Sequence, residues 1–471
     1  MPRLEDPVRI GSLRVPNRLY RAPVLECAGN GEGAVDALID ELEPAAEAGA
    51  GLICQGATIV RGEGGCAAPG MTRVDDPSFV ASLSRLTDRI HAHGSTIAVQ
   101  LEHGGLRSME TWHAAYRREH PDLRQLAVSR PPGFLRLLDR VGFLSYDPHV
   151  MSTAEVYELA ADFGRSAASA VEAGYDVVHL AGANMGIVQQ FLSPYYNRRT
   201  DEFGDGVRFL EVVHDEIRDR AGDVPLMTKV PAETAAPPFV RRRLSRADAV
   251  EICVRLAEIG YDAVVPVTAS VFWDMSIVKG EFPGRAWRDE RFRDGYADAF
   301  GGRLRAALVA LGNRAEALWY DFEPAWNAGL CAAVREAVDV PVLAEGGIRE
   351  RERIDRLLGT DCDMVGMARP FYAEPRLPAR LLDGDAGARA VCESCNNCAV
   401  PQVTGAPGVC RTPAVLREAG RLRKEGAYDG PGGHGGPRDH GGPRDHGGPG
   451  DHGGPGDHGG PGGRAGPPED P

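Results

Sequence analysis

The chain has 471 residues, of which 43% are hydrophobic, and it carries a formal net charge of −14. A chain of this length can bury a large core, either in one large domain or in two or three smaller ones. The acidic balance argues against a nucleic-acid partner or an anionic membrane surface, because both need a concentrated excess of Lys and Arg.

The first residues, MPRLEDPVRIG, lack the apolar run of a secretory signal, and no stretch of about 18 apolar residues occurs along the chain. We therefore expect a cytoplasmic protein with no membrane partner. In that compartment, the cysteines scattered through the first 362 residues should be reduced thiols.

Between about residues 7 and 382, short β-branched runs alternate with amphipathic helical stretches, which is typical of βαβ units around a parallel sheet. Helices are predicted at Ser78–His93 and Thr153–Ala173, the second with an N-cap at Ser152 or Thr153, and each is followed by a glycine. Eight strands are predicted: Arg18–Val24, Gly51–Ala57, Ser95–Gln100, Asp176–Ala181, Pro225–Val230, Asp262–Val267, Pro341–Ala344 and Met364–Met367.

Eight such repeats predict a (β/α)₈ TIM barrel, an α/β fold, with surplus length in loops at residues 107–151 and 270–323. These loops follow the third and sixth strands and are expected to cover the catalytic face. An open doubly wound sheet is the alternative fold, but no dinucleotide-type glycine fingerprint follows the first strand.

Three regions are predicted: the barrel over residues 1–390, a cysteine-rich segment over 391–425 and a tail over 426–471. The tail repeats Gly, Pro, Asp and His with a period of six, so it lacks the apolar residues of a core and is expected to be disordered. Loose binding of Ni²⁺ or Zn²⁺ is the other interpretation of the tail's repeated histidines, which are His434, His440, His446, His452 and His458.

The loops after strands seven and eight of such a barrel commonly bind phosphate, because backbone N–H groups and a helix N-terminus favour an anion there. Here those loops read AEGGIRER and GMARPFYAEP. Gly346 and Gly347 allow the backbone to approach a phosphate, and Arg369 supplies a fixed charge with several donors. The alternative is that the glycines only turn the chain.

Four cysteines crowd into nineteen residues with the spacing C-x₂-C-x₂-C-x₁₁-C. In a cytosolic protein this spacing suits an iron-sulfur cluster or a four-sulfur zinc site better than disulfides, although a loop that holds no metal is a third interpretation. The candidate metal ligands are Cys392, Cys395, Cys398 and Cys410.

Several longer blocks occur in a family order: PVRIGSLRVPNRLYRAP near the start, AVQLEHGG at the third strand, AGYDVVHLAGAN and QQFLSPYYNRRTDEFG at and after the fourth, PVLAEGGI at the seventh and GMARPFYAEPRLPARLLDGD at the eighth. Over about residues 5–412 the sequence resembles the old yellow enzyme family, in particular its trimethylamine dehydrogenase and 2,4-dienoyl-CoA reductase branch. The resemblance implies a TIM barrel that binds FMN and, at the cysteines, a [4Fe-4S] cluster.

The resemblance also assigns positions around the flavin. Residues 22–24 (Ala22, Pro23, Val24) would run beneath its ring, Gly56 or Ala57 would contact its edge, and Gln100 would bond its pyrimidine part. Lys229 would stabilise the reduced flavin by its charge. The phosphate would be held by Gly346, Gly347, Gly366 and Arg369.

The sequence departs from the family where the substrate binds. Family members place a His-x-x-His or His-x-x-Asn pair after strand four, followed two residues later by a proton-donating tyrosine. This chain has Ala181, Asn184 and Gly186 at those positions. Asn184 is therefore one catalytic candidate, and His103 and Asp274, beside Trp273, are two others. For His103 and Asp274 the alternatives are a buried structural histidine and a solvated loop aspartate.

The expected function is FMN-dependent transfer of hydride between NAD(P)H and/or an organic small-molecule substrate through flavin N5. The alternatives are an amine dehydrogenase or demethylase that passes electrons through a [4Fe-4S] cluster, a non-catalytic flavoprotein electron carrier, and, more distantly, a flavin-free barrel enzyme. Larger relatives continue into dinucleotide-binding domains where this chain has its tail, so electrons are expected from NAD(P)H directly or from a separate electron-transfer protein. Analogy with the family predicts a homo-oligomer.

Overall fold

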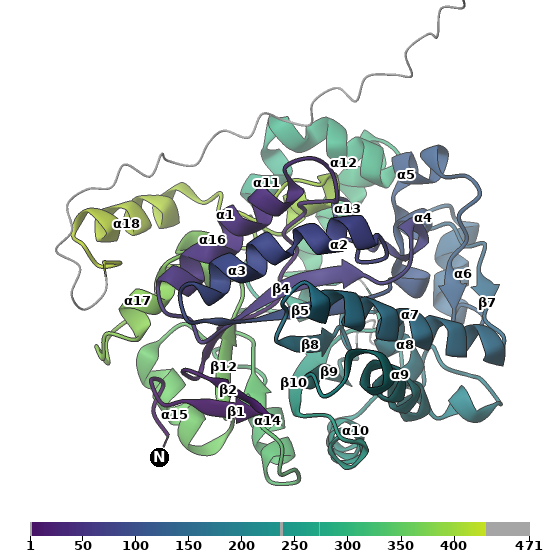
Figure 1. Cartoon of the computed structure of the whole chain (residues 1–471). Helices are drawn as coiled ribbons and strands as arrows, with labels where there is room; N and C mark the ends of the chain where they lie inside the picture. Colours follow the sequence, from purple (N-terminus) through teal and green to yellow (C-terminus); the bar gives the residue numbers. More distant parts are fainter. Residues whose placement is uncertain (1, 236–238, 273, 430–471) are drawn as a thin grey trace, which may run out of the picture. The chain divides into compact units, whose positions relative to one another are not determined.

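Parallel strands wind around a closed barrel in the computed structural model, which describes residues 2–235, 239–272 and 274–429 (Figure 1). The sheet order is β10-β9-β8-β5-β4-β3-β12-β11, with every neighbouring pair parallel. A parallel bridge between Val264 and Val342 joins the two edge strands and closes the ring. The barrel strands are β3 (Leu19–Arg21), β4 (Leu52–Ile59), β5 (Thr96–Glu102), β8 (Val177–Leu180), β9 (Leu226–Glu233), β10 (Ala263–Ala269), β11 (Leu343–Ala344) and β12 (Met364–Met367).

All eight predicted strands are confirmed, and their burial explains why these apolar runs form strands. Strands β5 and β9 are buried at every position, as expected for strands with the barrel core on one face and helices on the other. Alternate residues pack into two different clusters: Ala98 and Met227 belong to the barrel interior, whereas Ile97 and Leu226 belong to the layer between strands and helices.

The outer layer of the barrel is helical. The covering helices are α1 (Ala34–Glu47), α2 (Pro77–Ser82), α3 (Ser84–His91), α7 (Thr153–Glu172), α8 (Ile187–Leu192), α9 (Gly206–Ala221), α10 (Arg246–Ile259), α14 (Ala328–Arg335), α15 (Arg351–Thr360), α16 (Arg369–Ala373) and α17 (Leu377–Leu381). Helix α7 begins with a capping box in which Ser152 and Glu155 bond each other's backbone N–H groups, so the predicted cap is confirmed.

The predicted helix Ser78–His93 is instead two helices, α2 and α3, that meet at Leu83. The hydroxyls of Ser82 and Ser84 bond back to the carbonyls of Phe79 and Ala81, at 2.5 and 2.9 Å. Such bonds from serine to the preceding turn compete with the helical ladder and bend it, which explains the break.

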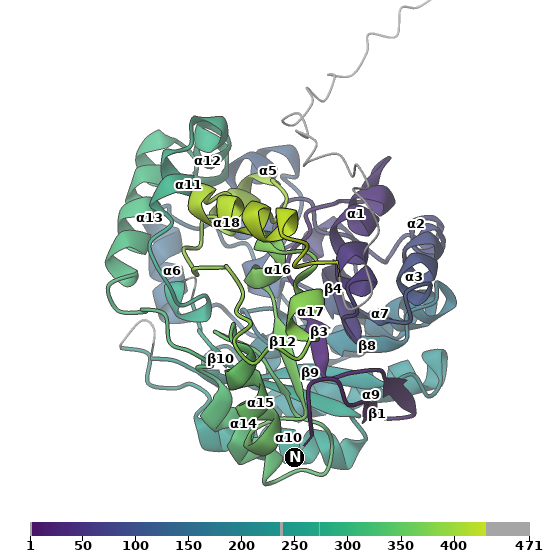
Figure 2. The ribbon, with the colours of Figure 1, turned by 90° about the vertical axis from the view of Figure 1, so that its left-hand side faces the viewer.

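The surplus segments after strands three and six are structured insertions and not irregular loops. The first holds α4 (Met109–Trp112), α5 (Ala114–Glu119), β6 (Leu126–Ala127), α6 (Gly133–Arg140) and β7 (His149–Val150), and the second holds α11 (Gly284–Arg288), α12 (Arg293–Phe300) and α13 (Arg303–Glu316). In both views α5, α11 and α12 lie on one side of the barrel (Figure 2). The opposite end carries the antiparallel hairpin of β1 (Val8–Ile10) and β2 (Leu13–Val15).

The cysteine-rich segment is part of the same compact unit as the barrel, which extends over Met1–Pro431. It includes the 3₁₀ turn η6 (Val400–Thr404), which packs on α11 and α12, and helix α18 (Pro413–Lys424), which packs on α16. Of the predicted disordered tail, residues 430–471 lie outside the described residues. Residues 426–429 are described, and Tyr428 is buried there with its hydroxyl donating to Glu374 at 2.8 Å. Across the part of the chain that the structure describes, no helix is both long and apolar enough to cross a membrane.

Candidate functional site

Two polar side chains from β5 point into the barrel near the carboxyl ends of its strands. Because Ala98 packs in the interior and Leu101 packs outside, the alternation of side chains along a strand places Gln100 and Glu102 on the inner face. Both are buried. The position of Gln100 therefore agrees with a contact to a ligand in the barrel mouth.

The segment predicted to run beneath a flavin ring, residues 22–24, lies against the predicted edge residues. The β4–β5 register shifts between Gln55 and Ala57, which makes Gly56 the extra residue of a bulge. A β-carbon on Gly56 would overlap the carbonyl oxygen of Val24, so only glycine fits there. Ala57 is paired with Gln100 in the register. The structure thus brings these predicted residues together.

Lys229 points into the barrel from β9 and has a carboxylate partner. Its Nζ lies 2.7 Å from Oε2 of Glu345, just past β11, and the Tyr20 hydroxyl donates to Glu345 Oε1 at 2.8 Å. Lys229 is buried, so this pair lies in a medium of low dielectric constant. The predicted basic residue is therefore charge-compensated by Glu345.

His179, which sequence reasoning did not single out, completes this polar centre from β8. Its Nδ1 lies 3.2 Å from Gln100 Nε2 and 3.6 Å from Cys54 Sγ, while its Nε2 has no hydrogen-bond partner among the described residues. Burial, with the Lys229 charge, holds the pKa of His179 well below its usual value, so the imidazole is neutral. When the Gln100 amide donates to Nδ1, the imidazole proton lies on Nε2.

This unused N–H inside the barrel fits a hydrogen bond to a planar heterocyclic ligand such as flavin. The signal in the sequence is a histidine at an inward position of the fourth strand, two residues before Ala181. This histidine could be recognised as a site residue only once the barrel topology showed which side chains of the strand point inward.

The predicted phosphate loops lie side by side because β11 and β12 are neighbours. Gly346 and Gly347 have φ values of 102° and 69°, where residues other than glycine are strained, and a β-carbon on either would run into Trp326. A β-carbon on Gly366 would likewise run into the Tyr20 ring. The glycines therefore allow close packing against these aromatic rings, and their predicted contact with the phosphate of FMN stays a prediction.

Arg369, at the start of α16, faces the cysteine-rich segment. Its guanidinium donates to the Asn396 side-chain oxygen and, at 3.4 and 3.5 Å, to the Lys279 carbonyl. The predicted contact of Arg369 with phosphate stays a prediction. In the structure, its guanidinium lies between α16 and the cysteine-rich segment and bonds Asn396.

The three catalytic candidates have different surroundings. Asn184 is exposed with a φ of 60°, a left-handed conformation that asparagine tolerates. His103 is buried against Gly65 and accepts a hydrogen bond from the Gly105 N–H at 3.1 Å, and burial lowers its pKa to about 3. Asp274 accepts hydrogen bonds from Ser276 N and Ser270 Oγ at 2.8 and 3.0 Å.

These contacts favour structural roles for two of the candidates. The His103 ring is bonded to its own loop, and Asp274 caps a 3₁₀ turn, η4 (Met275–Ile277), where burial raises the pKa of its carboxyl. Trp273, the predicted neighbour of Asp274, lies outside the described residues.

The four clustered cysteines line one cavity, together with Arg369, Asn396 and Arg411. Cys395 Sγ lies 2.9 Å from Thr412 Oγ1, and Arg349 donates to the Cys392 carbonyl at 2.7 Å. Burial raises the pKa of the Cys398 and Cys410 thiols, to about 12 and about 11. Four thiols beside three arginines are a donor set that fits an anionic iron-sulfur cluster. Within the described ranges, no three His, Cys, Asp or Glu side chains are grouped closely enough to hold a single metal ion.

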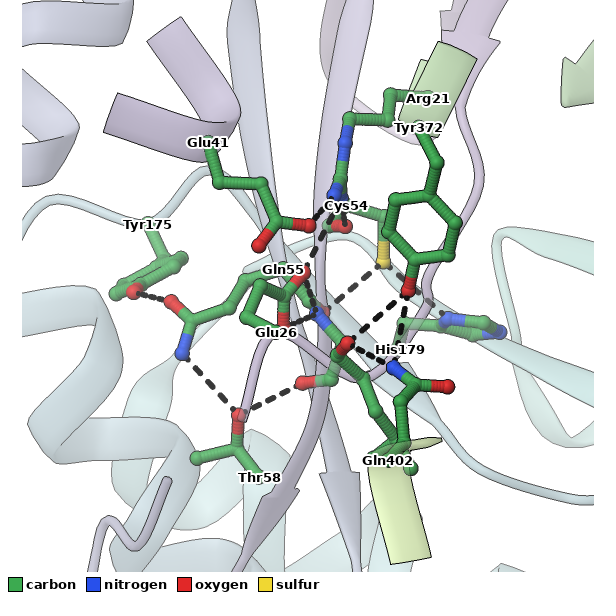
Figure 3. A network of polar contacts seen from close by, with 12 residues as sticks. Arg21, Glu26, Glu41, Cys54, Gln55, Thr58, Tyr175, His179, Tyr372 and Gln402 are labelled. Atoms are coloured by element: carbon green, nitrogen blue, oxygen red, sulfur yellow. Dashed lines mark hydrogen bonds and ion pairs between the residues drawn. The ribbon is translucent and has the colours of Figure 1, made fainter. Parts of the chain in front are cut away.

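A buried polar network connects this segment with the predicted flavin floor (Figure 3). The Leu25 carbonyl, directly after residues 22–24, accepts from Gln402 Nε2 of η6 at 2.6 Å and from the Tyr372 hydroxyl at 3.0 Å. The next residue, Glu26, accepts from the Gly56 N–H at 3.0 Å and pairs with Arg21 at 3.1 Å. The floor and the cysteine-rich segment are thus joined by direct hydrogen bonds.

Comparisons with known proteins bear on the family and the fold of the chain. The chain is 27% identical over 402 residues to a metal reductase of Desulforamulus reducens, covering 83% of this chain and 50% of the relative. It is 25% identical over 410 residues to dimethylamine dehydrogenase of Hyphomicrobium sp., covering 84% and 47%. The old yellow enzyme homologue from Zymomonas mobilis superimposes with a TM-score of 0.58 at 17% identity, covering 89% of this chain and 99% of that structure, which supports the barrel fold.

The chain spans about half the length of the two curated relatives described above. Residues 3–287, more than half of the chain, match a single family, and this match confirms the resemblance drawn from the sequence blocks. The chain belongs to the NADH:flavin oxidoreductase / NADH oxidase family.

Proposed function

We propose that the chain is an FMN-dependent oxidoreductase of the old yellow enzyme type, which transfers hydride between NAD(P)H and/or an organic substrate. The observation that carries the proposal is the polar centre of the barrel, where Gln100, Lys229 and His179 point inward near the strand ends. The Nε2 of His179 has no hydrogen-bond partner among the described residues. The interior of a TIM barrel is usually filled by layers of apolar side chains. A buried N–H donor without an acceptor in the protein therefore indicates a bound ligand that accepts its hydrogen bond.

The proposed roles follow from position. Residues 22–24 and Gly56–Ala57 would form the floor and edge of the ring site, and Gln100 and His179 would bond its polar edge. The Lys229 charge, reduced by Glu345, would favour the anionic reduced form. The phosphate would lie on Gly346, Gly347 and Gly366, with Arg369 beside them. Bound FMN would supply hydride transfer at its N5.

The remaining proposals concern partners. We propose that NAD(P)H reduces the flavin directly or that a separate electron-transfer protein does so, that the protein acts in the cytoplasm on a small molecule, and that it forms a homo-oligomer by analogy with its family. The non-catalytic alternative is a flavoprotein electron carrier.

A second candidate function is favoured by one observation, the cavity that all four clustered cysteines line. If it holds a [4Fe-4S] cluster, the hydrogen bonds from Gln402 and Tyr372 to Leu25 would place the cluster segment directly against the flavin floor. That arrangement suits an amine dehydrogenase or demethylase that passes electrons outward.

The test is an absorption spectrum of protein purified without oxygen, recorded before and after NADPH and before and after an amine, with iron and zinc assayed on the same sample. Flavin bands that bleach with NADPH, and about four iron atoms per chain, support the first proposal with a cluster. Bleaching by amine alone supports the second. Protein without flavin contradicts both.

Substitution of the cysteines separates cluster from flavin. The variant C395S/C398S should lose iron and keep FMN, whereas C253S, which alters a buried cysteine in α10, should keep both. Zinc in place of iron, or full iron content in C395S/C398S, contradicts the cluster assignment.

A further inference from the structure

Gly186 stands where the family resemblance places a proton-donating tyrosine, and a carboxyl group lies against it. A β-carbon on Gly186 would be 3.0 Å from Oε1 of Glu102 and 3.4 Å from the Ala181 carbonyl oxygen. The Gly186 backbone, at φ −63° and ψ 170°, is one that any residue adopts, so conformation does not demand glycine here. Gly186 has no side chain, and the atom nearest to where one would begin is a carboxyl oxygen of Glu102.

Glu102 has the surroundings of a general acid. It is the last residue of β5, faces inward, and has a side chain that is only 5% exposed. Two cations face it: Arg107 of the 3₁₀ turn η2 (Gly105–Arg107), whose Nη1 is 3.3 Å from Oε1, and Lys229 of β9. Burial raises the pKa of Glu102 in spite of both, and Lys229 is itself engaged by Glu345. Burial therefore makes the Glu102 carboxyl hold its proton more readily than an exposed glutamate does.

Arg107 offers a second feature that points to a ligand. Its Nε is buried and has no hydrogen-bond partner within the described part of the chain. A guanidinium N–H without a protein acceptor, beside the Glu102 carboxyl, suits the oxygen of a carbonyl or carboxylate group.

We propose that Glu102 donates the proton when the enzyme reduces an alkene conjugated to a carbonyl or carboxylate group, and that Arg107 binds the substrate oxygen. The proposal rests on the proposed FMN-dependent function. One alkene carbon gains a hydride from the cofactor, reduced beforehand by NAD(P)H, and the π bond breaks. The other carbon gains the proton of the Glu102 O–H. The Glu102 carboxylate then lies beside Arg107 and regains a proton from water.

The experiment separates the two half-reactions of the holoenzyme. NADPH should reduce the flavin of E102Q at the wild-type rate, whereas reoxidation of reduced E102Q by cyclohex-2-enone or cinnamate should be slower by about 100-fold or more, the usual contribution of a general acid. The matched control is E110Q: Glu110 is also buried and burial raises its pKa to about 7, but it bonds Ser108 and not the Gly186 region. E110Q should be reoxidised at the wild-type rate.

Two further readouts exclude a merely structural effect. In the double variant E102A/G186Y the space left by Glu102 can hold the tyrosine, and reoxidation by the enone should recover by about tenfold or more over E102A. Without turnover, ¹³C NMR of glutamate-labelled holoenzyme should show a carboxyl that titrates above the usual range and is absent from E102Q.

The proposal is overturned if reduced E102Q is reoxidised as fast as wild type, or if neither alkene reoxidises the wild-type enzyme. In the second case bleaching of the flavin by NADPH would still uphold the proposed function. Protein without flavin, or flavin that no donor reduces, would overturn both.

Discussion

Two buried clusters of charge, one inside the barrel and one behind it, are balanced differently. Inside, Lys229 forms an ion pair with one carboxyl, that of Glu345. Behind the strands, Arg21 faces two, Glu26 at 3.1 Å and Glu41 of α1 at 2.6 Å. Burial raises the pKa of both of these carboxyls, for Glu41 to about 8. A buried cation can neutralise one carboxylate, and the excess charge is removed by binding a proton.

The largest expected effect comes from removing Arg21, the cation that pairs with both carboxyls behind the strands. R21L leaves the buried Glu26 and Glu41 without a positively charged partner. Breaking a buried ion pair in this way costs about 3–5 kcal/mol of unfolding free energy. Urea unfolding of the purified protein measures the loss. R14L, which alters an exposed arginine of β2, should change stability by less than about 0.5 kcal/mol.

The triple variant R21L/E26Q/E41Q tests the cause, because amides at both positions need no counter-charge. It should regain much of the stability that R21L loses. A triple variant no more stable than R21L would mean that the arginine acts through packing and not through charge.

The second effect is a pH dependence. Because the pKa of Glu41 is raised to about 8 in the folded protein, the folded state binds a proton that the unfolded state releases above its normal pKa of about 4.5. Unfolding free energy should therefore fall as pH rises from about 4.5 to 8. Since 19% of the Glu41 side chain is exposed, solvent limits this fall to about 1–2 kcal/mol.

E41Q should flatten the curve over this range, and D40N, which alters an exposed acid on the same helix, should leave it unchanged. Equal slopes for wild type and E41Q between pH 5 and 8 would contradict the raised pKa.

The fold was largely predictable from sequence, because buried β-branched runs and helix caps are local signals. The second insertion was not, because α13 exposes Leu304 and Leu311, at 77% and 63%, so apolar residues on its solvent face obscure the helical pattern. In the site, the glycines after strands seven and eight could be found from their order. The contacts of Glu102 with Gly186 and of His179 with Gln100 could not, because they exist only once β5 and β8 are paired in the barrel.

The charge pair inside the barrel can be tested through the proposed flavin. E345Q removes the carboxylate that compensates Lys229, so the full positive charge would act on the reduced cofactor. The two-electron reduction potential should rise by about 30 mV, equivalent to about 1.4 kcal/mol. The control is E323Q, which breaks the Lys279–Glu323 pair, where Glu323 is 61% exposed. An unchanged potential in E345Q would place Lys229 outside the reach of the flavin.

The smallest expected effect concerns the contact between the cysteine-rich segment and the predicted flavin floor. Gln402 donates to the Leu25 carbonyl at 2.6 Å and to the Tyr372 hydroxyl at 3.2 Å, so Q402L should cost about 1 kcal/mol of unfolding free energy. If a cluster exchanges electrons with the flavin across this contact, Q402L should keep its iron yet transfer electrons between the two more slowly, as measured by rapid mixing with NADPH. T404V is the matched control, because the Thr404 hydroxyl bonds only within its own turn, to the Pro401 carbonyl at 2.7 Å, among the described residues. Equal transfer rates in Q402L and T404V would mean that the hydrogen bonds hold the cysteine-rich segment in place without serving electron transfer.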